Sequence, residues 1–307
     1  MVLTSPDRSE KWANSSGRAD MTPRSLFAMD EWAIRSAPTK ATDSMPALPA
    51  LPILRDACTG FARDAAREIM RIYVGDHGER TKADKSVVTD ADHAAEAIIV
   101  AGLRAIAPDT AVVAEEEMAA GHVPRMDGTP FWLVDPLDGT KEFVKKNGEF
   151  TVNIALVENG KAVLGIVLAP ATDVLWRGVA GLGADRSENG AAFAPISVRK
   201  PPAAGLTCLA SRSTAIYSQL DIWFRGNGLR VAEREHAGSS LKFCLIAEGK
   251  ADIYPRFGPT NEWDTAAGQG VLEAAGGEVV TTDNKPLLYG KKGFGNPHFI
   301  ARTKEAR

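Results

Sequence analysis

The sequence has few cysteines and no apolar run long enough to cross a membrane. Its three cysteines, Cys58, Cys208 and Cys244, lie far apart in a chain of 307 residues. An odd number without metal-ligand spacing favours neither a disulfide framework nor a zinc site, so we expect single buried thiols in a reducing compartment. A membrane-spanning helix needs roughly 18 consecutive apolar residues, and a signal peptide needs a charged and then apolar start; neither pattern is present. The sequence therefore predicts a cytoplasmic protein.

The chain also has little net charge of either sign. Lysine and arginine number 36 and aspartate and glutamate number 39, which leaves a formal charge of −3. A polymer of phosphates is bound through an excess of basic side chains, and this chain has no such excess overall. A nucleic acid is therefore not the expected partner. The hydrophobic content of 44% is ordinary for a globular protein, and it leaves the oligomeric state open.

The hydrophobic pattern predicts a polar tail followed by a folded region in two halves. Residues 1–49 are polar, mixed in charge and poorly periodic, which is typical of a disordered or loosely attached segment. In residues 50–195, two helical patterns precede short apolar runs and a hairpin signal, Asn159-Gly160 between two β-rich runs. In residues 196–307, strand and helix patterns alternate. This order predicts a layered α/β protein, with an α+β first half and an α/β second half.

The spacing of the apolar residues predicts the individual elements. The expected helices lie at 54–73, 92–107, 215–224, 241–248 and 265–275. The expected strands lie at 111–114, 131–134, 151–157, 162–168, 206–210, 229–232 and 252–254. Residues 187–195 are expected to form a loop.

The most informative segment is DPLDGT at 135–140, directly after an apolar run. Pro136 favours an extended Asp135, and Gly139 permits a tight turn. Two carboxylates thus follow a buried strand, with the carbonyl of Leu137 between them. Mg²⁺ prefers oxygen ligands of this kind, and a helix that begins after Gly139 would offer free N–H groups to a phosphate. An acidic surface turn is the alternative interpretation.

Three further acidic positions lie at expected strand or helix ends. Glu115 begins a run of three glutamates directly after an apolar run, and Asp264 precedes an alanine-rich helical pattern. Asp84 and Asp92 lie at the two ends of the segment DKSVVTDAD. A solvated loop is the ordinary interpretation of the glutamate run, and helix capping is that of Asp92 and Asp264. Ligands nevertheless collect where the strands of an α/β sheet end, so the residues alone leave both interpretations open.

Five segments together identify a family. They are DKSVVTDAD (84–92), VVAEEE (112–117), FWLVDPLDGTKEFVKKNGEFTVNIAL (131–156), GSSLKFCLIAEGKADIYPRFGPTNEWDTAAG (238–268) and NPHF (296–299). The acidic motifs resemble those of the inositol monophosphatase superfamily, which are Mg²⁺-dependent, lithium-sensitive phosphatases. The longer segments resemble its CysQ-type 3'(2'),5'-bisphosphate nucleotidases. The resemblance covers about residues 50–300.

This resemblance implies a phosphoric monoester hydrolase with the αβαβα layered sandwich of sugar phosphatases. The implied reaction converts adenosine 3',5'-bisphosphate to AMP and phosphate, with 3'-phosphoadenylylsulfate as a second substrate, in sulfur assimilation. The implied cofactors are two Mg²⁺ ions and a third at a weaker site. Related bacterial enzymes are associated with the inner face of the cytoplasmic membrane, so peripheral attachment is also implied, although nothing in the sequence explains it.

The resemblance also assigns roles to individual residues. The implied metal ligands are Glu115, Asp135, Asp138 and Asp264 and the carbonyl of Leu137. The implied catalytic residues are Asp84 and Thr140, which position the attacking water, and Glu115. The implied substrate-binding residues are Glu115, Leu137, Asp138, Gly139, Thr140, Gly238, Ser239, Lys242, Arg256 and Asp264.

The charges of these residues agree with metal-dependent chemistry. Four carboxylates contribute about −4 at neutral pH and a phosphomonoester about −2, so the site repels its substrate unless cations intervene. Lys242 and Arg256 are candidates to bind the second phosphate, and Phe257 to stack on the base. Two positions depart from the family pattern: Val87 replaces a common proline and Thr214 replaces a histidine.

Two other functions remain as alternatives. One is a phosphatase for inositol phosphate or another sugar phosphate. The other is a non-catalytic phosphate-binding protein that keeps the fold, although the full set of implied ligands argues against lost chemistry.

Overall fold

The computed structural model describes residues 48–75, 80–81, 87–126, 128, 130–210 and 217–307. The helices are α1 (Leu51–Tyr73), α2 (Asp90–Ile106), α3 (Glu115–Ala119), α4 (Thr140–Val144), α5 (Tyr217–Gly226), α6 (Leu241–Ala247) and α7 (Ala266–Ala274). Nearly all of the predicted tail of residues 1–49 lies outside the described residues, as do Asp84 and Thr214.

Most of the strands form two sheets. A seven-stranded sheet contains, in spatial order, β3 (Ala111–Ala114), β4 (Phe131–Asp138), β5 (Thr151–Glu158), β6 (Lys161–Ala169), β7 (Val174–Val179), β8 (Gly183–Glu188) and β9 (Ala194–Ile196). A five-stranded sheet contains β11 (Val231–His236), β10 (Leu206–Ala210), β12 (Ile253–Arg256), β14 (Phe299–Arg302) and β13 (Glu278–Thr281). The short β1 (Arg80–Thr81) and β2 (Val87–Val88) pair with each other.

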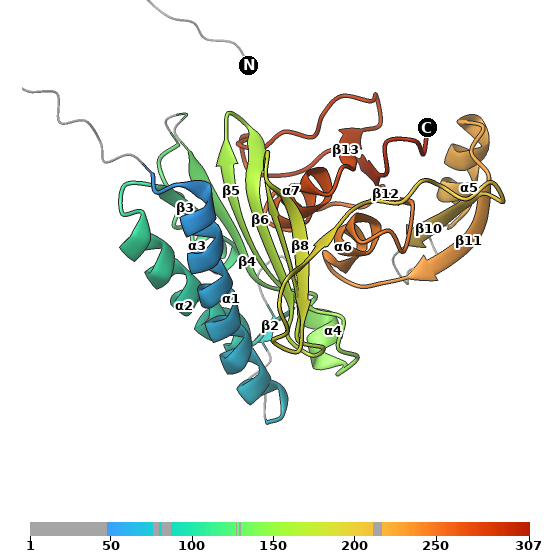
Figure 1. The fold of residues 1–307 in the computed structure, drawn as a ribbon. Coiled ribbons are helices and arrows are strands. Elements are labelled where there is room, and N and C mark those ends of the chain that lie inside the picture. Colours follow the sequence, from blue (N-terminus) through green and yellow to red (C-terminus); the bar gives the residue numbers. More distant parts are fainter. Residues whose placement is uncertain (1–47, 76–79, 82–86, 127, 129, 211–216) are drawn as a thin grey trace, which may run out of the picture. The chain divides into compact units, whose positions relative to one another are not determined.

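Residues Met45–Arg307 form one compact unit built of five layers (Figure 1). Helices α1 and α2 pack on one face of the seven-stranded sheet, and their apolar residues share a core with it. Helices α6 and α7 share a second core with the opposite face of that sheet and with β12 and β14. Helix α5 packs on the outer face of the five-stranded sheet. The order is αβαβα, which confirms the predicted fold class.

Most expected elements are found within a few residues of their predicted ends. The hairpin β5–β6 turns at Asn159 and Gly160, both with positive φ (50° and 75°), as the Asn-Gly signal predicts. The expected loop at 187–195 is partly wrong, because β8 extends to Glu188 and β9 begins at Ala194. The expected strand at 229–232 is shifted, since β11 begins at Val231 and is largely half-buried or exposed, which weakens its hydrophobic pattern.

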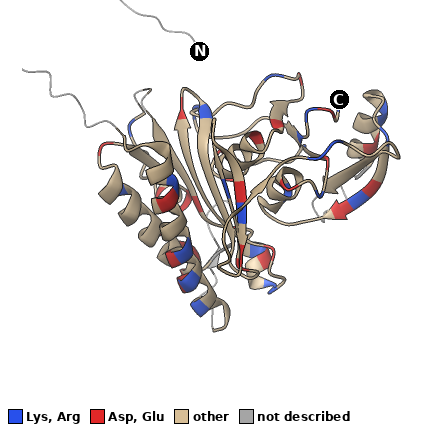
Figure 2. Ribbon diagram, viewed as in Figure 1, with Lys and Arg blue, Asp and Glu red and all other residues tan. Residues whose placement is uncertain are grey.

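Charge and cysteine usage agree with the expectations from composition. Acidic and basic positions alternate along α1 and β11 and do not form a face of one sign (Figure 2). All three cysteines are free and buried, as predicted. No helix in the described part of the chain is both long and apolar enough to span a membrane. The division of the folded region at residue 195 remains a prediction, although the first sheet ends at Ile196 and the second begins at Leu206.

Two glycines allow α7 to lie close against the seven-stranded sheet. Gly165 on β6 is paired with Gly178 on β7. A Cβ atom at Gly165 would lie 2.2 Å from the carbonyl oxygen of Ala267, and one at Gly178 would lie 2.5 Å from that of Gly270. The contact is therefore backbone against backbone and leaves no room for a methyl group. Because Asp264 directly precedes α7, this contact also sets the position of a candidate metal ligand.

We expect Gly178→Ala to lower the free energy of unfolding by about 1–3 kcal/mol, because the added methyl overpacks this contact. Gly60→Ala is the control, since Gly60 lies in α1 and a methyl group added there would meet no atom within 4 Å. That change should raise the free energy of unfolding by up to about 1 kcal/mol through helix propensity. Urea unfolding of both variants measures the two effects, and equal stability of the variants would contradict the packing argument.

Candidate active site

Two acidic segments lie together because β3 and β4 are parallel neighbours. Ala114 is paired with Val134, so Glu115, the first residue after β3, and Asp135, which lies in β4, are next to each other at the same edge of the sheet. Parallel sheets place ligands at this edge. Glu115 is half-buried and begins α3, and Asp135 is only 1% exposed. The alternative of an acidic surface turn is therefore wrong for Asp135.

A buried glutamate from another helix holds the backbone that follows Glu115. The carboxylate of Glu96, on α2, accepts the N–H of Glu116 at 2.7 Å and that of Glu117 at 2.8 Å. These are N-terminal amides of α3, whose own N-cap Ala114 offers no side-chain oxygen. Burial raises the pKa of Glu96 to about 7 although both N–H groups oppose the rise. The sequence does not predict this role for Glu96, because there it looks like one polar residue of an amphipathic helix.

The DPLDGT segment ends β4 and begins α4. The carboxylate of Asp135 accepts the N–H of Leu137 at 3.0 Å, and the pairing with β5 shifts register between Asp135 and Asp138. Gly139 has φ of 93°, and α4 begins directly after it, as expected. A Cβ atom there would lie 3.0 Å from the carbonyl oxygen of Glu149. The turn thus needs glycine both for its dihedral angle and for space.

The hydroxyl of Thr140 contacts Asp92. Thr140 Oγ1 lies 3.1 Å from Asp92 Oδ1 and 3.3 Å from the carbonyl oxygen of Leu137. Asp92 Oδ2 accepts the N–H and the hydroxyl of Thr89, at 2.8 and 2.7 Å, in a capping box at the start of α2. The capping role predicted for Asp92 is therefore correct. The sequence did not predict its contact with Thr140, although the position of Asp92 in the 84–92 motif points to a role in the site. Asp84, at the other end of that motif, lies outside the described residues.

The second half of the chain supplies Asp264 and Ser239. Asp264 accepts the N–H of Asn261 at 2.9 Å, and Thr265 is the N-cap of α7, so Asp264 is not a simple helix cap. Ser239 donates its hydroxyl to Asp138 Oδ2 at 2.9 Å. Ser239 has φ of 55°, a left-handed conformation that is uncommon for serine. Its hydroxyl also contacts that of Thr151 on β5.

The negative charges in this region act on one another. Burial raises the pKa of Asp135 well above its usual range, and the charges of Glu115, Asp138, Asp264 and Asp92 raise it further. Burial also raises the pKa of Asp264 to about 8, and the charge of Asp138 adds to the rise. The pKa of Asp138 is raised by burial too. The structure therefore brings together the four predicted metal-ligating carboxylates and adds Asp92 to them.

Two basic side chains lie beside this acidic cluster. The ammonium of Lys242 is buried and donates to the carbonyls of Ala237 and Ser239, at 3.0 and 2.6 Å. Burial lowers its pKa to about 8, and the charge of Asp138 opposes that change. The guanidinium of Arg256 donates to the carbonyls of Gly258 and Pro259.

A small cavity of about 80 Å³ lies between the acidic and basic side chains. It is lined by Asp138, Ser239, Lys242, Phe243, Tyr254, Arg256, Thr260, Asp264, Thr265 and Phe299. A drug-sized ligand occupies a pocket of roughly 300 Å³ or more, so this cavity has room for only part of a ligand of that size.

The other predicted substrate-side positions have ordinary structural contacts. The N–H of Gly238 donates to the carboxylate of Glu149 at 2.9 Å. Trp132 and Trp263, which precede acidic residues of the site in the sequence, are buried in the core. The Phe257 ring lies 6.0 Å from that of Trp223 and 5.7 Å from that of His298, measured between centroids.

The donor set suits a hard divalent cation in its chemistry. Its side chains offer only carboxylate oxygens, with a backbone carbonyl between two of them, and Mg²⁺ selects such ligands. Burial, together with the charges of neighbouring acids, raises the pKa values of Asp135, Asp138 and Asp264, and a bound cation would oppose that rise. Within the described residues, no three His, Cys, Asp or Glu side chains are grouped closely enough to hold a metal ion as they stand.

Comparisons with known proteins show the family of the chain. Residues 53–306 match the inositol monophosphatase family. The chain is 46% identical over 249 residues to the 3'(2'),5'-bisphosphate nucleotidase CysQ of Escherichia coli (strain K12), with 80% of this chain and 97% of that protein covered. The corresponding protein of Shigella flexneri is 44% identical over 247 residues, with the same coverage.

Solved structures give the same result. The crystal structure of CysQ from Bacteroides thetaiotaomicron, a bacterial member of the inositol monophosphatase family, matches with a TM-score of 0.69 at 36% identity. The match covers 82% of this chain and 97% of that one. Inositol monophosphatase from Anabaena matches with a TM-score of 0.65 at 27% identity, covering 83% and 92%.

We expect Asp135→Asn to raise the melting temperature in the presence of a chelator at pH 8, because it removes one of several mutually repelling buried charges. Asp252→Asn is the matched control: Asp252 is also fully buried, but it accepts two bonds from Arg199, at 2.8 and 2.9 Å. That change should cost about 3 kcal/mol, because it breaks a buried ion pair. Thermal unfolding, monitored by circular dichroism, measures whether each variant is more or less stable than the wild type. Destabilisation of similar size in both variants would mean that Asp135 is not under repulsion.

Proposed function

This chain belongs to the inositol monophosphatase family, and we propose that within the family it acts as a 3'(2'),5'-bisphosphate nucleotidase. The observation that carries the proposal is the 46% identity to a nucleotidase over 97% of that protein's length. The substrate is adenosine 3',5'-bisphosphate, which yields AMP and phosphate, with 3'-phosphoadenylylsulfate as a second substrate. A role in sulfur assimilation, a cytoplasmic location and membrane attachment remain predictions.

The family is metal-dependent and generally uses Mg²⁺. The proposed ligands in this chain are the carboxylates of Glu115, Asp135, Asp138 and Asp264 and the carbonyl of Leu137, which would hold two ions, with a third at a weaker site. Bound Mg²⁺ would supply the positive charge that these carboxylates lack, activate a water molecule and neutralise the leaving oxygen. The mutual repulsion of the four acids supports this assignment.

Thr140 and Asp92 are proposed to position the attacking water. Thr140 donates its proton to Asp92 Oδ1, so the lone pairs of its hydroxyl oxygen can accept a hydrogen bond from water. Asp92 is itself held by Thr89 and is 1% exposed, so it keeps the hydroxyl in one orientation. Asp84, outside the described residues, remains a candidate for the same task, and Glu115 remains one for catalysis at the metal side.

The two phosphates of the substrate are proposed to bind at two places next to Asp138, one at the start of α4 and one in the small cavity. The N–H groups at the start of α4, from Gly139 and Thr140 onward, suit the phosphate that is cleaved. Lys242 and Arg256 suit the second phosphate, because both line the small cavity and Lys242 has a third N–H beyond its two carbonyl bonds. Ser239 lines the same cavity, and with Gly238, which precedes it in the chain, it completes the proposed nucleotide side.

We expect phosphate release from adenosine 3',5'-bisphosphate to require Mg²⁺ and to fall by a factor of about 100 or more in Asp135→Asn, because loss of a metal-ligating carboxylate removes several kcal/mol of transition-state stabilisation. Asp283→Asn is the control, since Asp283 is an exposed turn residue that pairs with Lys285. A phosphate-release assay with and without EDTA measures both. Turnover at the wild-type rate in Asp135→Asn would refute its role.

We expect a preference of about 100-fold or more in kcat/KM for the bisphosphate nucleotide over inositol 1-phosphate, because two phosphates meet two basic side chains. Arg256→Met should raise KM about tenfold for the bisphosphate and little for adenosine 3'-monophosphate, which lacks the second phosphate. Steady-state kinetics on the three substrates decides between the two enzyme functions. A preference for the inositol ester would favour the sugar-phosphate alternative.

A further inference from the structure

A second and larger cavity lies on the far side of the five-stranded sheet from the small cavity. Successive residues of a strand face opposite sides, and β14 shows this clearly. Phe299 lines the small cavity beside Asp138, whereas Ile300 and Arg302 line the second one. The second cavity has a volume of about 490 Å³, within the range of roughly 300–1,000 Å³ typical of ligand pockets. No proposed catalytic or metal-binding residue lines it.

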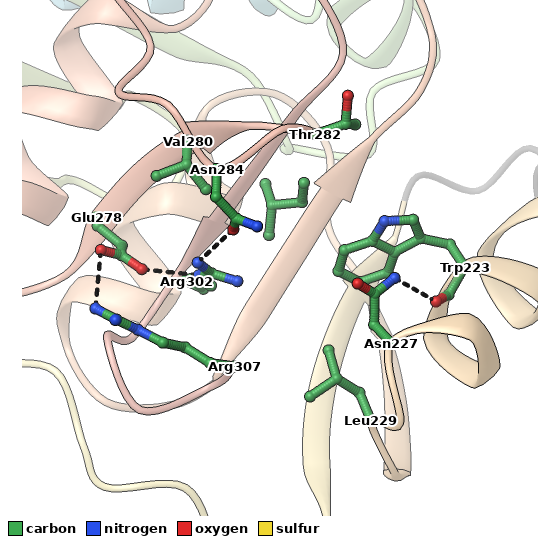
Figure 3. A pocket seen from close by; sticks show the side chains of 10 residues that line it. Trp223, Asn227, Leu229, Glu278, Val280, Thr282, Asn284, Arg302 and Arg307 are labelled. Carbon is green, nitrogen blue, oxygen red and sulfur yellow. Dashed lines mark hydrogen bonds and ion pairs between the residues drawn. The ribbon is translucent and has the colours of Figure 1, made fainter.

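One wall of this cavity is aromatic and apolar. Trp223, on α5, presents its indole ring to the cavity, with Leu229 below it (Figure 3). The ring is held by Phe224 at 5.1 Å and Phe257 at 6.0 Å between centroids. Ile300 adds an apolar surface from the sheet. A flat ring placed on this wall would lie against a fixed aromatic face.

The opposite wall is basic. Arg302 and Arg307 share one carboxylate, that of Glu278, at 2.9 and 3.5 Å (Figure 3). Two guanidinium groups thus lie on one side-chain carboxylate at this wall. The side chain of Arg302 is only 8% exposed and uses its Nε and one Nη2 proton on Glu278 and Asn284. Its remaining N–H groups suit an anionic ligand with several acceptor oxygens.

Uncharged polar side chains lie between the two walls. Asn227 and Asn284 offer amides and Thr282 offers a hydroxyl, and all three line the cavity (Figure 3). These groups exchange hydrogen bonds with hydroxyl groups. The cavity therefore presents, in sequence, an aromatic face, neutral hydrogen-bonding groups and two guanidinium groups.

We propose that this cavity is a binding site for a nucleoside monophosphate, separate from the active site. The base would stack on Trp223, the sugar hydroxyls would bond to the amide and hydroxyl side chains, and the phosphate would bind to Arg302 and Arg307. A purely apolar ligand would offer no acceptor to the N–H groups of Arg302 that Glu278 and Asn284 do not use, and an inorganic anion would leave the indole wall uncovered. A ligand with both parts satisfies both walls.

The test measures how many molecules of AMP bind to the full-length chain. Equilibrium dialysis with labelled AMP and Mg²⁺ should give two molecules per wild-type chain, one in the active site and one in this cavity. Trp223→Leu should reduce the number to one, and Arg307→Ala should weaken binding to the cavity about tenfold, because one charge-assisted contact is lost. Adenosine should compete at this site far less well than AMP.

Two neighbouring changes serve as matched controls. Ile222→Leu and Arg225→Ala alter exposed residues of α5 that do not line the cavity, so both should keep two molecules per chain. No binding of AMP to the wild-type chain would overturn the proposal, and so would a stoichiometry unchanged in both cavity variants. Phosphate release measured on the same preparations tests the nucleotidase function independently, because no cavity variant alters a proposed catalytic residue.

Discussion

The repulsion between buried carboxylates is the constraint on which the rest of the site depends. Asp135 is almost fully buried and lies in the field of Glu115, Asp138, Asp264 and Asp92. Such an arrangement is unfavourable for the isolated chain, so the scaffold has to hold the acids in place and cations have to offset their charge. The parallel pair β3–β4, the capped start of α2 and the backbone contact under α7 each fix one part of the cluster.

The sequence predicts the layered fold well because its elements have strong and consistent patterns. The apolar spacing of α1 and α2 and the Asn-Gly turn of β5–β6 leave few other structures open. The errors fall where local pattern and tertiary setting diverge. Strand β9 is three residues long with no buried position, and β11 is mostly half-buried or exposed, so neither shows a clear apolar period.

The candidate site is predicted in its residue types and not in its supporting contacts. The DPLDGT segment by itself predicts metal-binding oxygens at a tight turn, because its two acids, its proline and its glycine can be read directly from the sequence. Glu96 and Asp92 give no such indication, since each resembles an ordinary helix residue. Only the fold brings them to their partners, which are 20 and 48 residues away in the sequence. Contacts between residues far apart in the sequence depend on the topology of the fold, and the local periodicity of apolar residues does not predict that topology.

The hydroxyl contacts around Ser239 make the active site a product of the completed chain. Asp138 emerges from the ribosome early, whereas Ser239, which donates to it, and Asp264 follow about 100 residues later. A nascent first half therefore carries most of the acids without the groups that complete the site. The proposed set of site residues is therefore complete only after the second half of the chain has been synthesised and has folded against the first.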